Sequence, residues 1–125
     1  MEQSPNEDLF YEITFYEKLL EKHPDYAEAL SLLSELHTKT GQHEKGLEAD
    51  LRLTKLRPED PIAHYNLACS YSLLRRPKEA LEALERSISL GYNDFNFLQK
   101  DKDLQGLRGE PGYQVLLEKY FRKSS

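Results

Sequence analysis

The sequence predicts an all-α fold made of antiparallel helix pairs that stack on one another. When the chain is shifted by 34 residues, segments 27–57 and 61–91 align without a gap. Seven aligned positions are then identical, and five of the seven are apolar residues at helical spacings: Ala29/Ala63, Leu33/Leu67, Leu47/Leu81, Glu48/Glu82, Ala49/Ala83, Arg52/Arg86 and Leu56/Leu90. A fixed period of this size is typical of stacked helical arrays. No alternation typical of β-strands occurs along the chain.

The N-terminal part predicts a flexible lead-in followed by a lone helix. Residues 1–8 are mostly polar, and such a segment cannot bury enough apolar surface to pack. The segment 9–23 predicts an amphipathic helix that ends before Pro24, because its apolar residues follow spacings of three and four: Leu9, Ile13, Tyr16, Leu19 and Leu20. In the 34-residue frame this is a second helix without its first. We therefore expect it either to act as a cap or to leave an apolar flank for a partner.

Repeat one spans 25–58, with helices expected over 26–39 and 43–56 and a turn at Gly41 between them.

Repeat two spans 59–92, with helices expected over 61–74 and 77–90. Asp60 is a favourable N-cap residue, and Pro61 stands at the first helical position, where a missing N–H costs nothing.

The segment 93–125 predicts a partial repeat and a C-terminal cap. Asp94 stands where Asp60 stands in the preceding repeat, and a short helix can follow it. An exposed end of a helical array must be covered. The remaining apolar residues can fold back for this purpose: Leu104, Leu107, Tyr113, Leu116, Leu117, Tyr120 and Phe121.

At these positions the chain resembles the tetratricopeptide repeat family. In repeat two, YNLACSYSLL and KEALEALERSISL supply the large and small apolar residues of the family's 34-residue unit: Leu67, Ala68, Tyr71, Ala80 and Leu84. Repeat one matches more loosely, since His37, Gly46 and Asp50 replace a usual tyrosine, alanine and aromatic residue. We expect Asp50 to be exposed. The segment DKDLQGLRGEPGYQVLL resembles the end-of-group motif of such arrays, and the resemblance implies a short right-handed superhelix.

Composition limits the function classes. The 125 residues suffice for one domain, and a net charge of −5 argues against a nucleic-acid partner, which normally needs a basic surface. A single cysteine, Cys69, and no charged-then-apolar leader after Met1 favour the reducing cytoplasm. No apolar run approaches the ~18 residues of a membrane span, so we expect no membrane association.

No constellation of residues predicts catalysis. The four histidines, His23, His37, His43 and His64, show no metal-ligand spacing, and Cys69 has no basic neighbour in sequence. Glycine-rich phosphate loops and nucleophile motifs are missing as well. We expect a protein that is not an enzyme and has no cofactor and no metal.

The family resemblance implies that the first helices of the repeats line a concave groove. It assigns to the groove Leu32, Glu35, Ile62, Tyr65, Asn66, Cys69 and Leu73. Apolar and hydrogen-bonding side chains together suit a peptide or one face of a helix. The alternative for these residues is simple packing between repeats. A version that grips a terminal carboxylate is disfavoured, because Glu35 occupies a position where asparagine is needed.

These observations predict a non-catalytic protein–protein interaction module, or scaffold, that binds a peptide or helix of a partner protein. The alternative is a self-associating assembly module that uses the N-terminal helix. Either reading is compatible with a monomer or a weak homodimer.

Overall fold

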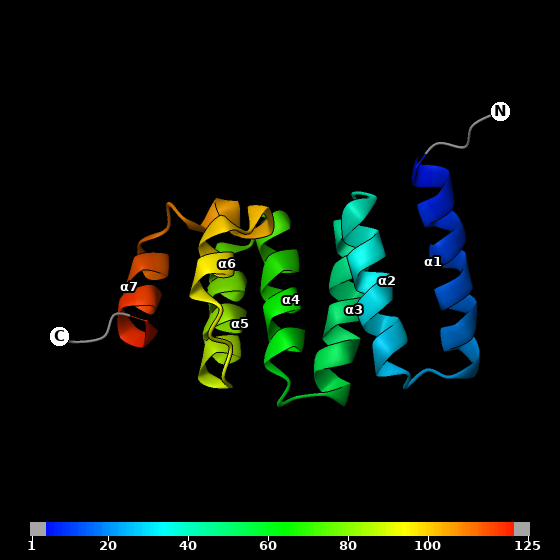
Figure 1. Ribbon diagram of the computed structural model, residues 1–125, viewed down its shortest axis with the longest axis horizontal. Helices are drawn as coiled ribbons and strands as arrows, with labels where there is room; N and C mark the ends of the chain where they lie inside the picture. Colours follow the sequence, from blue (N-terminus) through cyan, green and yellow to red (C-terminus); the bar gives the residue numbers. More distant parts are fainter. Residues whose placement is uncertain (1–4, 122–125) are drawn as a thin grey trace. The chain divides into compact units, whose positions relative to one another are not determined.

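The computed structural model describes residues 5–121, with side chains from residue 7 onward. In this range the chain forms helices and turns and no strand (Figure 1). The elements are α1 (Pro5–Lys22), α2 (Ala27–Lys39), α3 (His43–Leu56), α4 (Pro61–Leu73), α5 (Pro77–Ser89), α6 (Phe95–Lys100), the 3₁₀ helix η1 (Lys102–Leu107) and α7 (Pro111–Tyr120). The predicted all-α class with adjacent helix pairs is confirmed. The superhelical course of the array stays a prediction.

Local sequence signals explain the ends of several helices. The Asp60 side chain accepts a hydrogen bond from the Ile62 N–H and caps α4, and Pro61 is the first residue of that helix. Gly41 and Gly91 follow α2 and α5 with φ of 78° and 119°, a region that glycine adopts without steric cost. The predicted turns therefore lie where glycine permits them.

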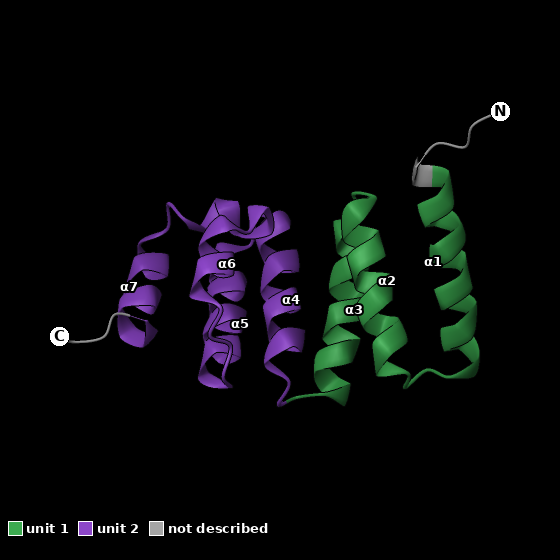
Figure 2. Ribbon diagram, in the orientation of Figure 1, with its two compact units in different colours: residues 1–58 green, residues 59–125 purple. Residues whose placement is uncertain are grey.

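The chain divides into two compact units, Met1–Pro58 and Glu59–Ser125 (Figure 2). The boundary coincides with the end of repeat one as the sequence defines it. Within the described residues, no helix combines the length and the apolar character needed to cross a lipid bilayer.

In the first unit α2 packs against α3, and α1 packs against α2. The core consists mainly of leucine and isoleucine from the three helices: Ile13, Leu20, Leu30, Leu33, Leu36, Leu47 and Leu53. Helix α1 begins at Pro5, four residues before the expected start at Leu9. Residues 1–4 of the predicted lead-in lie outside the described residues.

Asp50 is fully buried, so the expectation that it is exposed was wrong. The carboxylate accepts a short hydrogen bond from the Ser34 hydroxyl on the facing helix α2. Burial of a carboxylate requires such compensation. Repeat two has Ala68 and Leu84 at the same two positions, so repeat one has a polar pair where repeat two has an apolar one.

In the second unit α4 packs against α5, and the segment after Gly91 folds back onto this pair. Helix η1 lies on α4, and α7 lies on α5. Leu98, Leu104 and Leu107 are almost fully buried in these contacts. The α7 side of the contact buries Tyr113, Leu116 and Leu117.

Two polar links and one ring contact join the C-terminal helix to the rest of the second unit. The Lys119 ammonium and the Tyr120 hydroxyl both donate to the Glu85 carboxylate, at 2.8 Å and 3.1 Å. The rings of Phe95 and Phe121 stack with centroids 4.7 Å apart.

Candidate functional site

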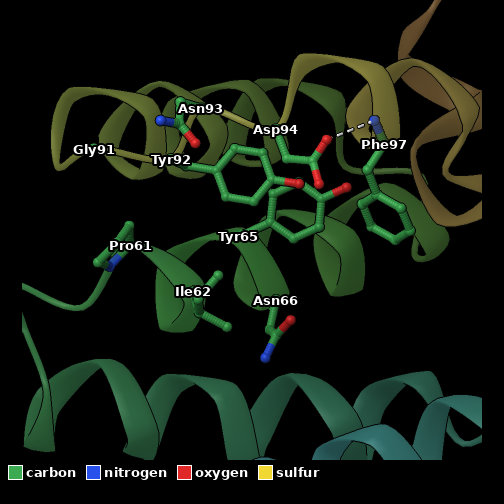
Figure 3. Close-up of a pocket in the computed structure, with 9 residues that line it drawn as sticks. All are labelled: Pro61, Ile62, Tyr65, Asn66, Gly91, Tyr92, Asn93, Asp94 and Phe97. Atoms are coloured by element: carbon green, nitrogen blue, oxygen red, sulfur yellow. Dashed lines mark hydrogen bonds between the residues drawn. The ribbon is translucent and has the colours of Figure 1, made fainter.

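A pocket of about 530 Å³ opens in the second unit between the start of α4 and the segment that follows α5 (Figure 3). Nine residues line it: Pro61, Ile62, Tyr65, Asn66, Gly91, Tyr92, Asn93, Asp94 and Phe97. Its volume lies within the range of small-molecule and side-chain binding pockets.

Helix α4 supplies one wall. Ile62, Tyr65 and Asn66 stand at spacings of three and four, so they share one face of the helix. Ile62 is 51% exposed at the entrance, whereas Tyr65 is buried. This wall therefore offers an apolar edge, an aromatic ring and an amide.

The opposite wall comes from the segment 91–97. The Tyr92 ring stacks on Tyr65 with centroids 4.4 Å apart and an interplanar angle of 11°. The Phe97 ring is 6.2 Å from Tyr65 and is itself 52% exposed. The Asp94 carboxylate accepts from the Phe97 N–H at 3.1 Å, which fixes both residues at the start of α6 (Figure 3).

Hydrogen bonds to Asp101 hold the Tyr65 side chain, which forms the floor of the pocket, in place. The Tyr65 hydroxyl donates to the Asp101 carboxylate at 2.6 Å, and the other carboxylate oxygen accepts from the Asp103 N–H at 2.9 Å. The Arg108 guanidinium donates to the Asp101 carbonyl oxygen at 2.7 Å. Burial raises the pKa of the Tyr65 phenol, and the bond to Asp101 raises it further. The tyrosine therefore stays neutral and keeps a fixed orientation.

Potential metal-ligand atoms of Cys69, Asp101 and Asp103 lie within 4.8 Å of one another next to this floor. Both carboxylate oxygens of Asp101 already accept hydrogen bonds from Tyr65 and from the Asp103 backbone. Through these two bonds Asp101 supports helix α4 at Tyr65.

The sequence-predicted groove residues fall into three groups. Ile62, Tyr65 and Asn66 meet in the pocket. Cys69 is buried, with its thiol 3.8 Å from the Asp101 carboxylate, and Leu73 is partly buried at the end of α4.

The remaining two predicted residues belong to the first unit. Leu32 and Glu35 are exposed on α2, and the Glu35 carboxylate lies 3.7 Å from the Lys39 ammonium.

Sequence reasoning missed Tyr92, Asn93, Asp94 and Phe97 as lining residues. They follow Gly91, where the 34-residue frame weakens, so the frame assigns them no surface. One signal was available, because Asp94 aligns with the N-cap Asp60 and marks the start of a helix next to α4.

The first unit holds a smaller hollow of about 300 Å³, lined by Glu17, Leu20, Glu21, Leu33, His37, Lys45, Glu48, Ala49 and Arg52. His37 is buried, and burial lowers its pKa. The lining carries charges of both signs. It therefore favours no ligand charge.

Comparison with known families supports the repeat assignment. Residues 61–94 match the family model of the tetratricopeptide repeat. The match covers α4, α5 and the first pocket residues after Gly91.

Similar proteins include three named relatives. The chain is 35% identical over 86 residues to a protein of Arabidopsis thaliana whose name describes it as chloroplastic, and the alignment covers 66% of this chain and 26% of the relative. It is 40% identical over 67 residues to a TPR repeat-containing protein of Picosynechococcus sp., over 54% of this chain and 17% of the relative. It is 46% identical over 52 residues to the CTR9 homolog of Arabidopsis thaliana, over 42% of this chain and 5% of the relative. The chain thus spans about a quarter or less of the length of these relatives.

Proposed function

Since the chain belongs to the tetratricopeptide repeat family, we propose that it is a non-catalytic protein-interaction module that binds a segment of a partner protein in the pocket of α4. Repeats of this family generally mediate contacts between proteins. We place the partner segment between Ile62 and Phe97, at the two exposed apolar edges of the pocket.

The proposal rests on a preformed pocket in the second unit whose edges are exposed apolar side chains. Ile62 and Phe97 are both about half exposed, while the Tyr65 and Tyr92 rings between them are buried and stacked. Apolar anchors around a preformed pocket are typical of the residues that dominate binding energy at protein interfaces. A site that needs little reordering loses less entropy when it binds.

Affinity capture from a cell lysate tests the proposal. The full chain and an Ile62→Ala, Phe97→Ala double variant serve as baits, because both side chains are exposed enough to be truncated without opening the core. Val115→Ala is the matched control, since Val115 is an exposed apolar residue of α7 outside the pocket. We expect the double variant to lose partners that the control retains. An unchanged set of partners would contradict the pocket assignment.

A second candidate function is self-association through α1. Phe10, Tyr11 and Phe15 on this helix are exposed, and exposed aromatic residues in such a group often mark contact surfaces. Ile13, by contrast, is buried in the core of the first unit and cannot take part. Light scattering at about 10 µM, a range in which weak dimers form, should show a dimer that Phe15→Asp dissociates. A monomer at all concentrations removes this candidate.

We also propose that the chain resides in the cytoplasm, because its single cysteine, Cys69, needs no oxidising compartment. The name of one relative says "chloroplastic" of that protein. Fractionation of the cells that make this protein distinguishes the two compartments, and recovery in plastids would contradict the proposal.

A further inference from the structure

The pocket in the second unit carries charge of one sign. Asp94 is the one ionisable side chain among its nine described lining residues apart from the tyrosines, and none of the nine is a lysine, arginine or histidine. Three aromatic rings and the amides of Asn66 and Asn93 complete the lining. A partner group that carries negative charge would therefore meet a carboxylate with no cation among these residues to compensate it.

The aromatic floor is electron-rich. The Tyr65 hydroxyl donates a hydrogen bond to the Asp101 carboxylate, which pushes electron density toward the ring. Burial raises the pKa of Tyr92; a hydrogen bond with Tyr65 opposes this rise, whereas the nearby Asp94 and Asp101 carboxylates add to it. Two negative charges thus act on the stacked pair from within the same unit. Negative potential next to aromatic faces attracts cations.

We propose that the pocket binds an arginine side chain of the partner segment, with the guanidinium stacked against the Phe97 ring and paired with the Asp94 carboxylate. This inference deepens the proposed function and rests on it. One Asp94 oxygen accepts from the Phe97 N–H, and a carboxylate has further lone pairs with which to accept from a guanidinium.

The chemistry of the lining favours arginine over lysine. A guanidinium is planar, stacks on aromatic rings and donates several hydrogen bonds in one plane. The pocket supplies an exposed ring in Phe97, a carboxylate in Asp94 and amide oxygens in Asn66 and Asn93. An ammonium group is more strongly hydrated and would use fewer of these acceptors.

Capped heptapeptides with randomised flanks and one fixed central residue are the probe. Pools with central arginine, lysine, citrulline, leucine or aspartate are tested against the full chain. Citrulline has nearly the shape of arginine and no charge. We expect the arginine pool to bind about tenfold more tightly than the citrulline pool, and less tightly as salt rises.

Two variants test the named contacts. Asp94→Asn removes the charge and keeps a favourable N-cap, and should weaken arginine-pool binding about threefold. Phe97→Leu keeps an apolar side chain and removes the ring, and should weaken it about fivefold. Glu82→Gln is the charge control, because Glu82 is exposed on α5 and does not line the pocket. It should leave binding unchanged.

The outcomes of these binding experiments distinguish failure of the arginine inference from failure of the proposed function. If the leucine pool binds as well as the arginine pool, and Phe97→Leu weakens both while Asp94→Asn weakens neither, the arginine inference is overturned and the proposed function stands. Equal binding of the lysine and arginine pools overturns the choice of arginine. If no pool binds, or if neither variant affects binding, the pocket is not the peptide site and the proposed function fails with it.

Discussion

Exchange of the buried pair Ser34 and Asp50 for the residues of repeat two tests how repeat one is stabilised. Repeat two has Ala68 and Leu84 at the aligned positions. The perturbation is therefore Ser34→Ala, Asp50→Leu and the double variant, which together form a double-mutant cycle.

The magnitudes follow from burial. Asp50 is 0% exposed, so Ser34→Ala deprives a buried carboxylate of a hydroxyl donor and should cost about 1–3 kcal/mol of unfolding free energy. Asp50→Leu alone forces a larger apolar side chain against the Ser34 hydroxyl and should cost about 1–3 kcal/mol through overpacking.

The double variant removes both polar groups and restores the apolar pair of repeat two. Replacement of a buried polar pair by apolar residues of suitable volume is often neutral or stabilising. We expect its stability within about 1 kcal/mol of the parent chain, so the coupling energy between the two sites should be close to the sum of the two single-variant costs, about 2–6 kcal/mol.

Urea unfolding followed by circular dichroism measures the four free energies. Hydrogen exchange then locates the change, which should fall in α2 and α3 because both residues lie in the first unit. Additive single-variant effects, or a Ser34→Ala variant as stable as the parent, would refute the reasoning that the pair acts as one buried unit.

Three further predictions concern stability. Gly46→Ala should stabilise the chain by about 1 kcal/mol, because the added methyl group meets neighbours at ordinary contact distances of 3.5–3.7 Å and alanine favours the helix. Gly91→Ala should destabilise the chain, because Gly91 has a φ of 119°. Thermal unfolding compares the two variants. Burial lowers the pKa of His37, so the unfolded chain binds a proton at this residue before the folded chain does, and stability should fall as pH drops below about 6.5. His37→Tyr introduces the residue found at the aligned position, Tyr71, and should flatten the pH dependence of stability below about 6.5. An unchanged profile would contradict this role of His37. Removal of 110–125 should lower the melting temperature or cause aggregation, at about 1.5–3 kcal/mol for each large apolar side chain that it uncovers; a soluble chain with an unchanged melting temperature would show that α7 is not needed by the second unit.

The helices could be predicted because their signals are local. Apolar spacing, Asp60-Pro61 and the glycines at 41 and 91 each act within one or two turns of chain, and the observed ends lie within a few residues of the expected ones. The N-terminal start was less accurate, since Pro5 can open a helix whose first turn is polar.

Asp50 was misjudged for a reason that lies outside its own helix. A carboxylate at a core position looks unfavourable until the hydroxyl of Ser34, 16 residues away, is placed opposite it. Repeat one thus differs from repeat two at both aligned positions, with serine for alanine and aspartate for leucine. Comparison of aligned pairs, instead of single positions, would have revealed the signal.

Only the wall of the pocket that α4 supplies could be predicted from the sequence. Ile62, Tyr65 and Asn66 were assigned to one surface because helical spacing places them there. Tyr92, Asp94 and Phe97 follow Gly91, where the repeat frame weakens, and the bond between Tyr65 and Asp101 ties the chain just after them to α4. Contacts between residues 36 positions apart have no local sequence signature.

The bond from Tyr65 to Asp101 also has an optical consequence. The chain has eight tyrosines and no tryptophan, so its fluorescence in the near ultraviolet comes from tyrosine. A phenol that donates to a carboxylate loses its excited-state proton readily and emits weakly, so we expect weak emission from Tyr65 while it donates to Asp101. Release of η1 from α4 would break that bond and let Tyr65 emit. A rise in tyrosine emission should therefore accompany detachment of this segment from α4, without any added label.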